Sequence, residues 1–184
     1  MPIEDNTVRV FPAELFAGTG SVQFKQGDWA NQTAFRAELQ QSWLEQYSEY
    51  LGTEAASSLL HGLIEGGSLF DHDERTTLQA WMGDEIVGVA SVRQLDGLSL
   101  LTLMEVKMSH RRQGIGSALL KALDAVCSLL VVHVSIHRPH LKLFYARSGF
   151  RELQPAIVDH SGHLLTFDVM VSSCLLYTSD AADE

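Results

Sequence analysis

Residues 109–123 read SHRRQGIGSALLKAL, and the rest of the chain can be placed around this stretch. An apolar run over 98–108 leads into two arginines, and a Gly-x-Gly pattern follows at the start of an amphipathic helix predicted over 113–127. Glycines let a backbone come close to a ligand, and the first turn of a helix presents unpaired N–H groups. Helix-dipole charge and two guanidinium groups add attraction for phosphate, which predicts an anion site. A basic helix start that binds nothing is the competing interpretation of a Gly-x-Gly pattern taken by itself.

The kind of phosphate ligand can be narrowed from the same residues. A Walker loop needs Gly-Lys-Ser/Thr after four spacer residues, and residues 115–117 contain no such lysine. A dinucleotide-binding loop needs a third small residue at the position that Leu119 occupies. The pattern that remains is Arg-x-x-Gly-x-Gly, formed by Arg111, Gly114 and Gly116. This pattern resembles the acyl-CoA pyrophosphate loop of the GCN5-related N-acetyltransferase (GNAT) family.

A second motif that resembles the same family stands downstream. Residues 143–150 read LFYARSGF, a predicted helix that carries Tyr145 and is followed by a Ser-Gly-Phe turn. GNAT enzymes commonly show a similar tyrosine helix that ends in Gly-Phe after the fifth strand. The order also fits, because a glycine loop, a helix, an apolar strand over 129–136 and the tyrosine helix follow one another. By this resemblance, which covers roughly half of the chain, the sequence is identified as a member of the GNAT family.

The resemblance implies the GNAT fold, an α/β domain of α+β type. Its central sheet is mixed and mostly antiparallel, has helices on both faces, and is splayed between the fourth and fifth strands. The periodicity of apolar residues is consistent with this plan. The expected elements, in chain order, are a strand over 21–25, helices over 31–51 and 54–64, strands over 76–82, 85–92 and 98–108, the helix over 113–127, a parallel strand over 129–136, the tyrosine helix, and a hairpin of 151–155 with 164–171.

The acetyltransferase domain is expected to span residues 21–172. Residues 1–20 are expected to form an N-terminal extension with an edge strand over 7–11. The stretch DHDER over 71–75 is interpreted as a solvated, charged loop. The tail over 173–184 has no apolar period, so it is interpreted either as non-native adapter sequence or as a disordered natural tail.

Composition bounds the location and the partners. With 184 residues the chain is long enough for one domain with a substantial core. Two cysteines form neither a disulfide framework nor a zinc pattern, and no secretory signal is recognised, so a reducing cytoplasm is expected. No apolar stretch is long enough to cross a bilayer, so no membrane partner is expected. The net charge of −10 argues against nucleic acid as a partner and favours cationic small molecules or basic peptide ends.

The family resemblance implies transfer of an acetyl group from acetyl-CoA, the co-substrate, to an amine. The CoA pyrophosphate is expected on backbone N–H groups over 112–117, and the pantetheine arm is expected to pair like an extra strand with the fourth strand around Glu105. In many family members an asparagine seven residues before the tyrosine contacts CoA. Arg138 stands there instead, so either a cation meets phosphate or the contact is missing. The expected cofactor-binding residues are Met104, Val106, Met108, Arg111, Arg112, Gln113, Gly114, Ile115, Gly116, Ser117 and Arg138.

A catalytic base is expected because the attacking amine must be neutral, whereas alkyl amines resemble lysine with a pKa near ~10.4. His133 is the first candidate, since it stands twelve residues before Tyr145 and some N-terminal protein acetyltransferases place a catalytic Glu or His at that spacing. A histidine with a pKa near ~6.5 accepts a proton at neutral pH. Glu105 is the second candidate, because a carboxylate is costly to bury within an apolar strand. The alternatives are a histidine satisfied on a half-buried strand and a structural carboxylate.

Tyr145 is the candidate acid for the departing CoA thiolate, because it matches the usual proton donor of the family. A phenol pKa near ~10 is close enough to a thiol pKa near ~8.5 for useful proton transfer. The alternative is a tyrosine whose ring serves packing alone.

Two further features are expected to carry no metal chemistry. His160 and His163 flank a Ser-Gly turn, and two histidines without a third ligand predict a plain turn rather than a metal site. A substrate contact remains open there, because this hairpin often borders the acceptor pocket in the family. Cys127 is expected to belong to the core.

The expected function is therefore acetyl-CoA-dependent N-acetylation of a primary amine, on a small molecule or a peptide N-terminus, by direct transfer in a ternary complex. A regulatory module that binds CoA without turnover is one alternative, and an unrelated α/β phosphate-binding protein is another. The acceptor stays open among amino acids, polyamines, antibiotics and protein N-termini, because variable helices and loops select it. A homodimer is also allowed.

Overall fold

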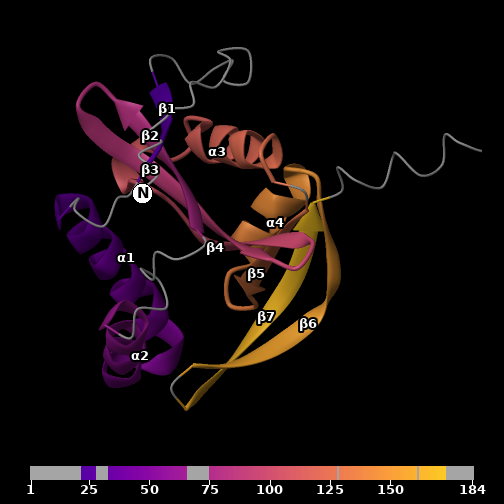
Figure 1. The fold of residues 1–184 in the computed structure, drawn as a ribbon. Coiled ribbons are helices and arrows are strands. Elements are labelled where there is room, and N and C mark those ends of the chain that lie inside the picture. The colour runs from indigo at the N-terminus through magenta and orange to yellow at the C-terminus, as the bar shows by residue number, and fades with distance from the viewer. Residues whose placement is uncertain (1–21, 28–32, 66–74, 128, 161, 173–184) are drawn as a thin grey trace, which may run out of the picture.

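The computed structural model describes residues 22–27, 33–65, 75–127, 129–160 and 162–172. The expected edge strand over 7–11, the tail over 173–184 and most of the charged loop over 71–75 lie outside these residues. The described residues form four α-helices and seven strands, arranged as Figure 1 shows. In chain order they are β1 Val22–Gln26, α1 Thr33–Leu51, α2 Thr53–Glu65, β2 Arg75–Met82, β3 Glu85–Leu95, β4 Leu98–Val106, the 3-10 turn η2 Met108–His110, α3 Ile115–Asp124, β5 Leu130–Ser135, α4 Pro139–Arg147, β6 Phe150–His160 and β7 His163–Ser172.

The strands form one sheet in the order β1-β2-β3-β4-β5-β7-β6. Every neighbouring pair is antiparallel except β4 and β5, which are parallel. The β4–β5 pairing covers only Ser99–Leu101 of β4 and Leu130–Val132 of β5, so the second half of each strand leaves its partner. The expected mixed, mostly antiparallel sheet with a splay between the fourth and fifth strands is confirmed.

Strand β4 contains a bulge at the point where its pairing with β5 ends. Leu101 and Leu103 pair with consecutive residues of β3, so Thr102 is the extra residue. An extra residue reverses the alternation of side chains beyond it. Leu101 accordingly contacts the cluster around α3, whereas Leu103 contacts the cluster around α1. Past the bulge, Met104 lies on the α3 side and Glu105 on the α1 side.

The core has two layers, one on each face of the sheet. Helix α3 begins at Ile115 and buries the apolar face that its sequence spacing predicts, and α4 packs beside it. Helix α1 covers part of the opposite face through Phe35 and Leu39, and α2 packs against α1 (Figure 1). No helix within the described ranges is both long and apolar enough to span a membrane.

Most expected elements occur within a few residues of their predicted bounds, and the closing hairpin differs most. Strand β6 extends well beyond the predicted 151–155, whereas β7 exceeds the predicted 164–171 by one residue at each end. Proline cannot donate a ladder hydrogen bond, so within sheets it is found on edge strands and at bulges. In the structure β6 is an edge strand with a register shift between Glu152 and Pro155, which lets the strand continue past the proline.

Candidate functional site

The glycine loop forms an open turn at the start of α3. Gly114 occupies the N-cap with φ of +84°, in the left-handed region, and Arg112 before it has φ of +62°. Residues 111–114 and Ser117 are exposed, whereas Ile115 is buried and anchors the helix in the core. The N-cap residue is a glycine, so the first turn of α3 receives no hydrogen bond from a side chain at the cap position. The turn therefore presents backbone N–H groups in the way that an anionic ligand requires.

Gly116 has a packing role in this turn. A Cβ atom at Gly116 would lie 3.2 Å from Cε of Met104 and 3.4 Å from Cζ of Phe144. Both distances are at or below the tight end of ordinary contacts, so a larger residue would push Met104 or Phe144 away. The second glycine of the motif thus lets the start of α3 lie directly against β4 and α4.

Tyr145 lies buried on α4, with 7% of its surface exposed. Its ring sits between Phe144 and Phe150, with centroid separations of 5.2 and 5.3 Å, and its hydroxyl donates to Sδ of Met104 at 3.8 Å. Burial raises the pKa of Tyr145 well above the ordinary value, and the charge of Glu105 adds to this effect. The hydroxyl therefore carries its proton at any physiological pH. Met104 contacts both this hydroxyl and the glycine loop, so it connects the two sequence motifs.

Glu105 and Arg111 form an ion pair at the end of β4. Nη2 of Arg111 donates to Oε1 of Glu105 at 2.5 Å, and Nε of Arg111 donates to the carbonyl oxygen of Val106 at 3.0 Å. The other carboxylate oxygen accepts a hydrogen bond from Nε1 of Trp43 on α1, at 3.4 Å. The structure thus joins a candidate base and a candidate phosphate ligand that the sequence treated separately. Whether Arg111 also contacts phosphate stays a prediction.

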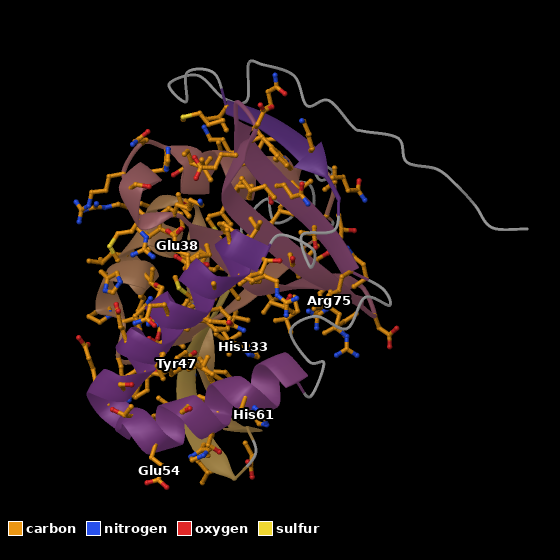
Figure 2. All side chains as sticks on the ribbon, turned by 90° about the vertical axis from the view of Figure 1, so that its left-hand side faces the viewer. Glu38, Tyr47, Glu54, His61, Arg75 and His133 are labelled. Carbon is orange, nitrogen blue, oxygen red and sulfur yellow. The ribbon has the colours of Figure 1, made fainter. Side chains whose placement is uncertain are left out.

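His133 lies on the same side of the sheet as Glu105. Val132 and Val134 are buried on the α3 side, so alternation places His133 on the opposite face of β5, where its ring is exposed and lies 5.9 Å from that of Phe167. Figure 2 views the molecule from the α1 side and labels His133 to the right of Tyr47 of α1. Both candidate bases therefore face α1, whereas the candidate acid Tyr145 comes from the α3 side.

Arg138 directs its side chain toward α1. It precedes α4 as the N-cap residue, and its guanidinium carbon lies 5.5 Å from the ring centroid of Tyr47. Nη2 of Arg138 is buried and forms no hydrogen bond with any described residue. The buried hydroxyl of Tyr50 has the hydroxyls of Tyr47 and Ser135 as neighbours. The expected contact between Arg138 and a CoA phosphate is untested, but the observed position favours contact with a ligand bound beside α1.

Two adjoining cavities lie along α1. The first, of about 290 Å³, lies between α1 and the end of β4 and is lined by the carboxylates of Glu38, Glu45 and Glu105. The second, of about 220 Å³, lies between α1 and the start of α4 and is lined by Tyr50 and Arg138 among others. The residues that line both cavities are Ser42, Glu45, Met108 and Arg111.

Two aromatic residues of α1, Tyr47 and Tyr50, belong to this site, and neither of them was predicted from the sequence as a site residue. Tyr47 contacts Arg138, and the ring of Tyr50 stacks on His137 with centroids 4.4 Å apart and planes at 15°. Phe35, Leu39, Trp43 and Tyr47 follow one another at four-residue steps along α1. Each such step advances about 40° around a helix, so this stripe begins in the core at Phe35 and turns gradually away from the core. This drift, visible in the sequence, could have indicated that Tyr47 faces the site.

The other residues singled out in the sequence lie in the core or in strands. Cys127 is half-buried against the core cluster, as expected, and burial raises the pKa of its thiol. His163 begins β7. Among the residues that the structure describes, no group of three or more His, Cys, Asp or Glu side chains could hold a metal ion.

Comparison with known proteins adds an independent observation. A family model described as "Acetyltransferase (GNAT) domain" matches residues 37–166, a range that contains the glycine loop and Tyr145. No curated protein sequence matches the chain.

Solved structures show the same fold at low sequence identity. The PaiA N-acetyltransferase from Thermoplasma acidophilum, in complex with coenzyme A, has a TM-score of 0.67 and 15% identity over 83% of this chain and 98% of that chain. Apo-form YjaB from Escherichia coli has a TM-score of 0.63 and 14% identity over 83% and 97%. A GCN5-related N-acetyltransferase structure from Rhodopseudomonas palustris has a TM-score of 0.62 and 18% identity over 81% and 93%. At these identities the likeness is one of fold.

Proposed function

This chain belongs to the GNAT acetyltransferase family, and we propose that it transfers the acetyl group of acetyl-CoA to a primary amine by direct attack in a ternary complex. Enzymes of this family use acetyl-CoA as co-substrate, so the proposal concerns the acceptor and the mechanism. The observation that carries it is the position of Met104, which contacts both Gly116 and the hydroxyl of Tyr145. A donor bound at the glycine loop would thus have a buried proton donor close to it.

The donor site is assigned to the glycine loop and the free side of β4. The uncapped first turn of α3 supplies N–H groups for the diphosphate, and the left-handed conformation at Gly114 suits this fit. Beyond Leu101, β4 no longer pairs with β5, so its backbone from Met104 to Val106 can pair with the pantetheine arm as a strand would. Acetyl-CoA supplies a thioester whose carbonyl carbon is open to attack by an amine.

Tyr145 is assigned the role of general acid. As the new N–C bond forms, the C–S bond breaks and the sulfur leaves as a thiolate, which takes the phenol proton of Tyr145. Burial keeps this phenol protonated until the thiolate forms. A thiol in the same dry surroundings also has a raised pKa, so the proton transfer stays within reach.

The base is assigned to the α1 side of the sheet, where the amine would enter. Glu105 lines the cavity of about 290 Å³ and is close enough to Tyr145 to affect its pKa. His133 lies on the same face of the neighbouring strand β5 and would act through water. In both assignments the base takes the proton that the amine nitrogen loses, so each residue must be mutated in turn to identify which of them is the base.

Release of CoA thiol, followed colorimetrically with a panel of primary amines, tests the proposal. We expect thiol release that depends on the amine and that falls sharply in Tyr145→Phe. A module that binds CoA without turnover would bind acetyl-CoA in calorimetry but release no thiol with any amine. That result would reject the enzymatic proposal and leave the donor-site assignment standing.

A further inference from the structure

The cavity between α1 and the start of α4 contains two polar groups for which the acetyl transfer described above has no use. Nη2 of Arg138 is buried, and no described residue accepts a hydrogen bond from it. The buried hydroxyl of Tyr50 is the second donor, and the hydroxyls of Tyr47 and Ser135 are its neighbours. Both residues line this cavity of about 220 Å³. Burying a donor without an acceptor costs free energy, and the cost is larger for a charged donor. Such groups in a folded protein point to an acceptor supplied from outside.

The two donors are held in place by aromatic contacts. The guanidinium of Arg138 lies over the ring of Tyr47, which Figure 2 labels on α1, and the ring of Tyr50 stacks on His137. Burial raises the pKa of Tyr50 to about 12, with the neighbouring Tyr47 adding to this, so its hydroxyl keeps its proton. A guanidinium that is flanked on its face still offers N–H groups along its edge, in a fork that matches a carboxylate.

Arg111 and Arg138 both line this cavity, but only one of them has an ion-pair partner among the described residues. Arg111 is paired with Glu105, and no ion pair in the described part of the chain joins Arg138 to Glu45 or Glu49, the two glutamates of the same cavity. Glu45 continues into the adjoining cavity, where Glu105 also lies. Arg138 therefore has no ion-pair partner among the described residues of its cavity, whereas in the adjoining cavity Glu105 is paired with Arg111 and Glu38 with Lys107.

We propose that the acceptor is an amino acid, or a close analogue that carries a carboxylate near its amine. Arg138 and Tyr50 donate hydrogen bonds to the carboxylate, and the amine lies in the adjoining cavity beside Glu105 and Glu45. This inference rests on the proposed function, because the reacting amine is placed where acetyl transfer requires it. A polyamine would bring a cation to Arg138, and a long peptide would offer no carboxylate at the required distance.

Matched acceptors test this inference directly. Each amino acid is compared with its amide and with its decarboxylated amine, in thiol-release kinetics and in calorimetric binding to the protein saturated with CoA. We expect kcat/KM for the amino acid to exceed that for its amide about tenfold or more, the effect of a charge-assisted contact. Arg138→Gln should raise the KM of the amino acid by about the same factor and change the KM of its amide little.

Two further variants make the result specific. Tyr50→Phe keeps the stacked ring and removes only the hydroxyl, so it should weaken amino-acid binding even if Arg138→Gln does not fold. Arg147→Gln changes an arginine at the other end of α4 and should leave amino-acid binding as it is.

The possible outcomes separate this inference from the proposed function. Turnover of amines without any preference for a carboxylate would overturn the inference and leave the proposed function intact. Calorimetric binding of amino acids that depends on Arg138, without thiol release, would support the inference and reject the proposed function. Absence of amino-acid binding in calorimetry would overturn the inference, as would equal binding of acids and amides.

Discussion

Replacement of Gly114 by alanine tests the glycine loop with a magnitude that follows from its backbone. Gly114 has φ of +84°, and an L-residue in the left-handed region loses about 1–2 kcal/mol. The alanine variant has two ways to respond. It can keep the turn and carry the strain in the folded protein, or it can relax to negative φ and turn the N–H groups at the start of α3 away from their ligand.

The strain of about 1–2 kcal/mol appears as lost stability in the first response and as lost affinity for CoA in the second. A strained turn lowers the free energy of unfolding by about 1–2 kcal/mol, which shifts Tm by about 2–4 °C per kcal/mol in a chain of this size. A relaxed turn leaves Tm nearly unchanged, but CoA must restore the turn on binding, which weakens its affinity by a factor of about 5–30. We expect the second response to dominate, because the loop is exposed and can move. Thermal unfolding and calorimetry with CoA measure the two parts.

Gly97 provides the matched control. It has φ of +78° in the turn between β3 and β4, and a Cβ atom there would contact nothing within 4 Å. Gly97→Ala should therefore lower Tm by a similar strain and leave the affinity for CoA unchanged. If Gly114→Ala keeps the Tm of the wild type, so that its turn has relaxed, and still binds CoA as tightly as the wild type does, the loop over 111–117 does not hold the diphosphate and the assignment of the donor site is wrong.

Three further predictions concern catalysis and pH. Tyr145→Phe should lower kcat by about 10²-fold with little change in the affinity for CoA. An unchanged rate constant for acetyl transfer in single-turnover assays would exclude the acid role. His133→Ala should reduce kcat near neutral pH and flatten the pH profile around ~6.5, whereas survival of activity in this variant but not in Glu105→Gln would identify the carboxylate as the base. Burial raises the pKa of Tyr145 above 10.0 and that of Tyr50 to about 12. In the unfolded chain these tyrosines release their protons at lower pH, so the stability that is present below about pH 10 should decline as the pH rises toward 12. Urea unfolding should show a smaller decline in Tyr145→Phe than in the wild type. A stability of the wild type that does not change over this pH range would contradict the prediction.

The parts of the fold that the sequence predicts are those that local interactions determine. The helix at Ile115 follows from its apolar spacing, and the turn before it follows from a glycine that tolerates positive φ. The tyrosine helix begins at Pro139, a residue preorganised for the first helical position. In each case the residues that decide the conformation are neighbours in the chain, so their pattern is sufficient.

The parts that the sequence does not predict depend on distant partners. The ion pair between Arg111 and Glu105 requires the chain to fold back at the 3-10 turn after β4. The direction of Arg138 is set by Tyr47, which lies 91 positions earlier in the chain on α1. A long side chain can reach in several directions, and only the folded neighbours select one. The family resemblance therefore predicted a donor site, but it did not predict which residues line the two cavities along α1.

Thr102 can be removed from β4 without changing the faces on which the later residues lie. Leu101 and Leu103 pair with neighbouring residues of β3, so in a strand that lacks Thr102 regular alternation would still place Met104 on the α3 side and Glu105 on the α1 side. What the extra residue adds is a local bend and a stronger twist, at the point where β4 leaves β5. Deletion of Thr102 should therefore retain the contacts of Met104 and Glu105 but straighten β4 and narrow the opening beside it.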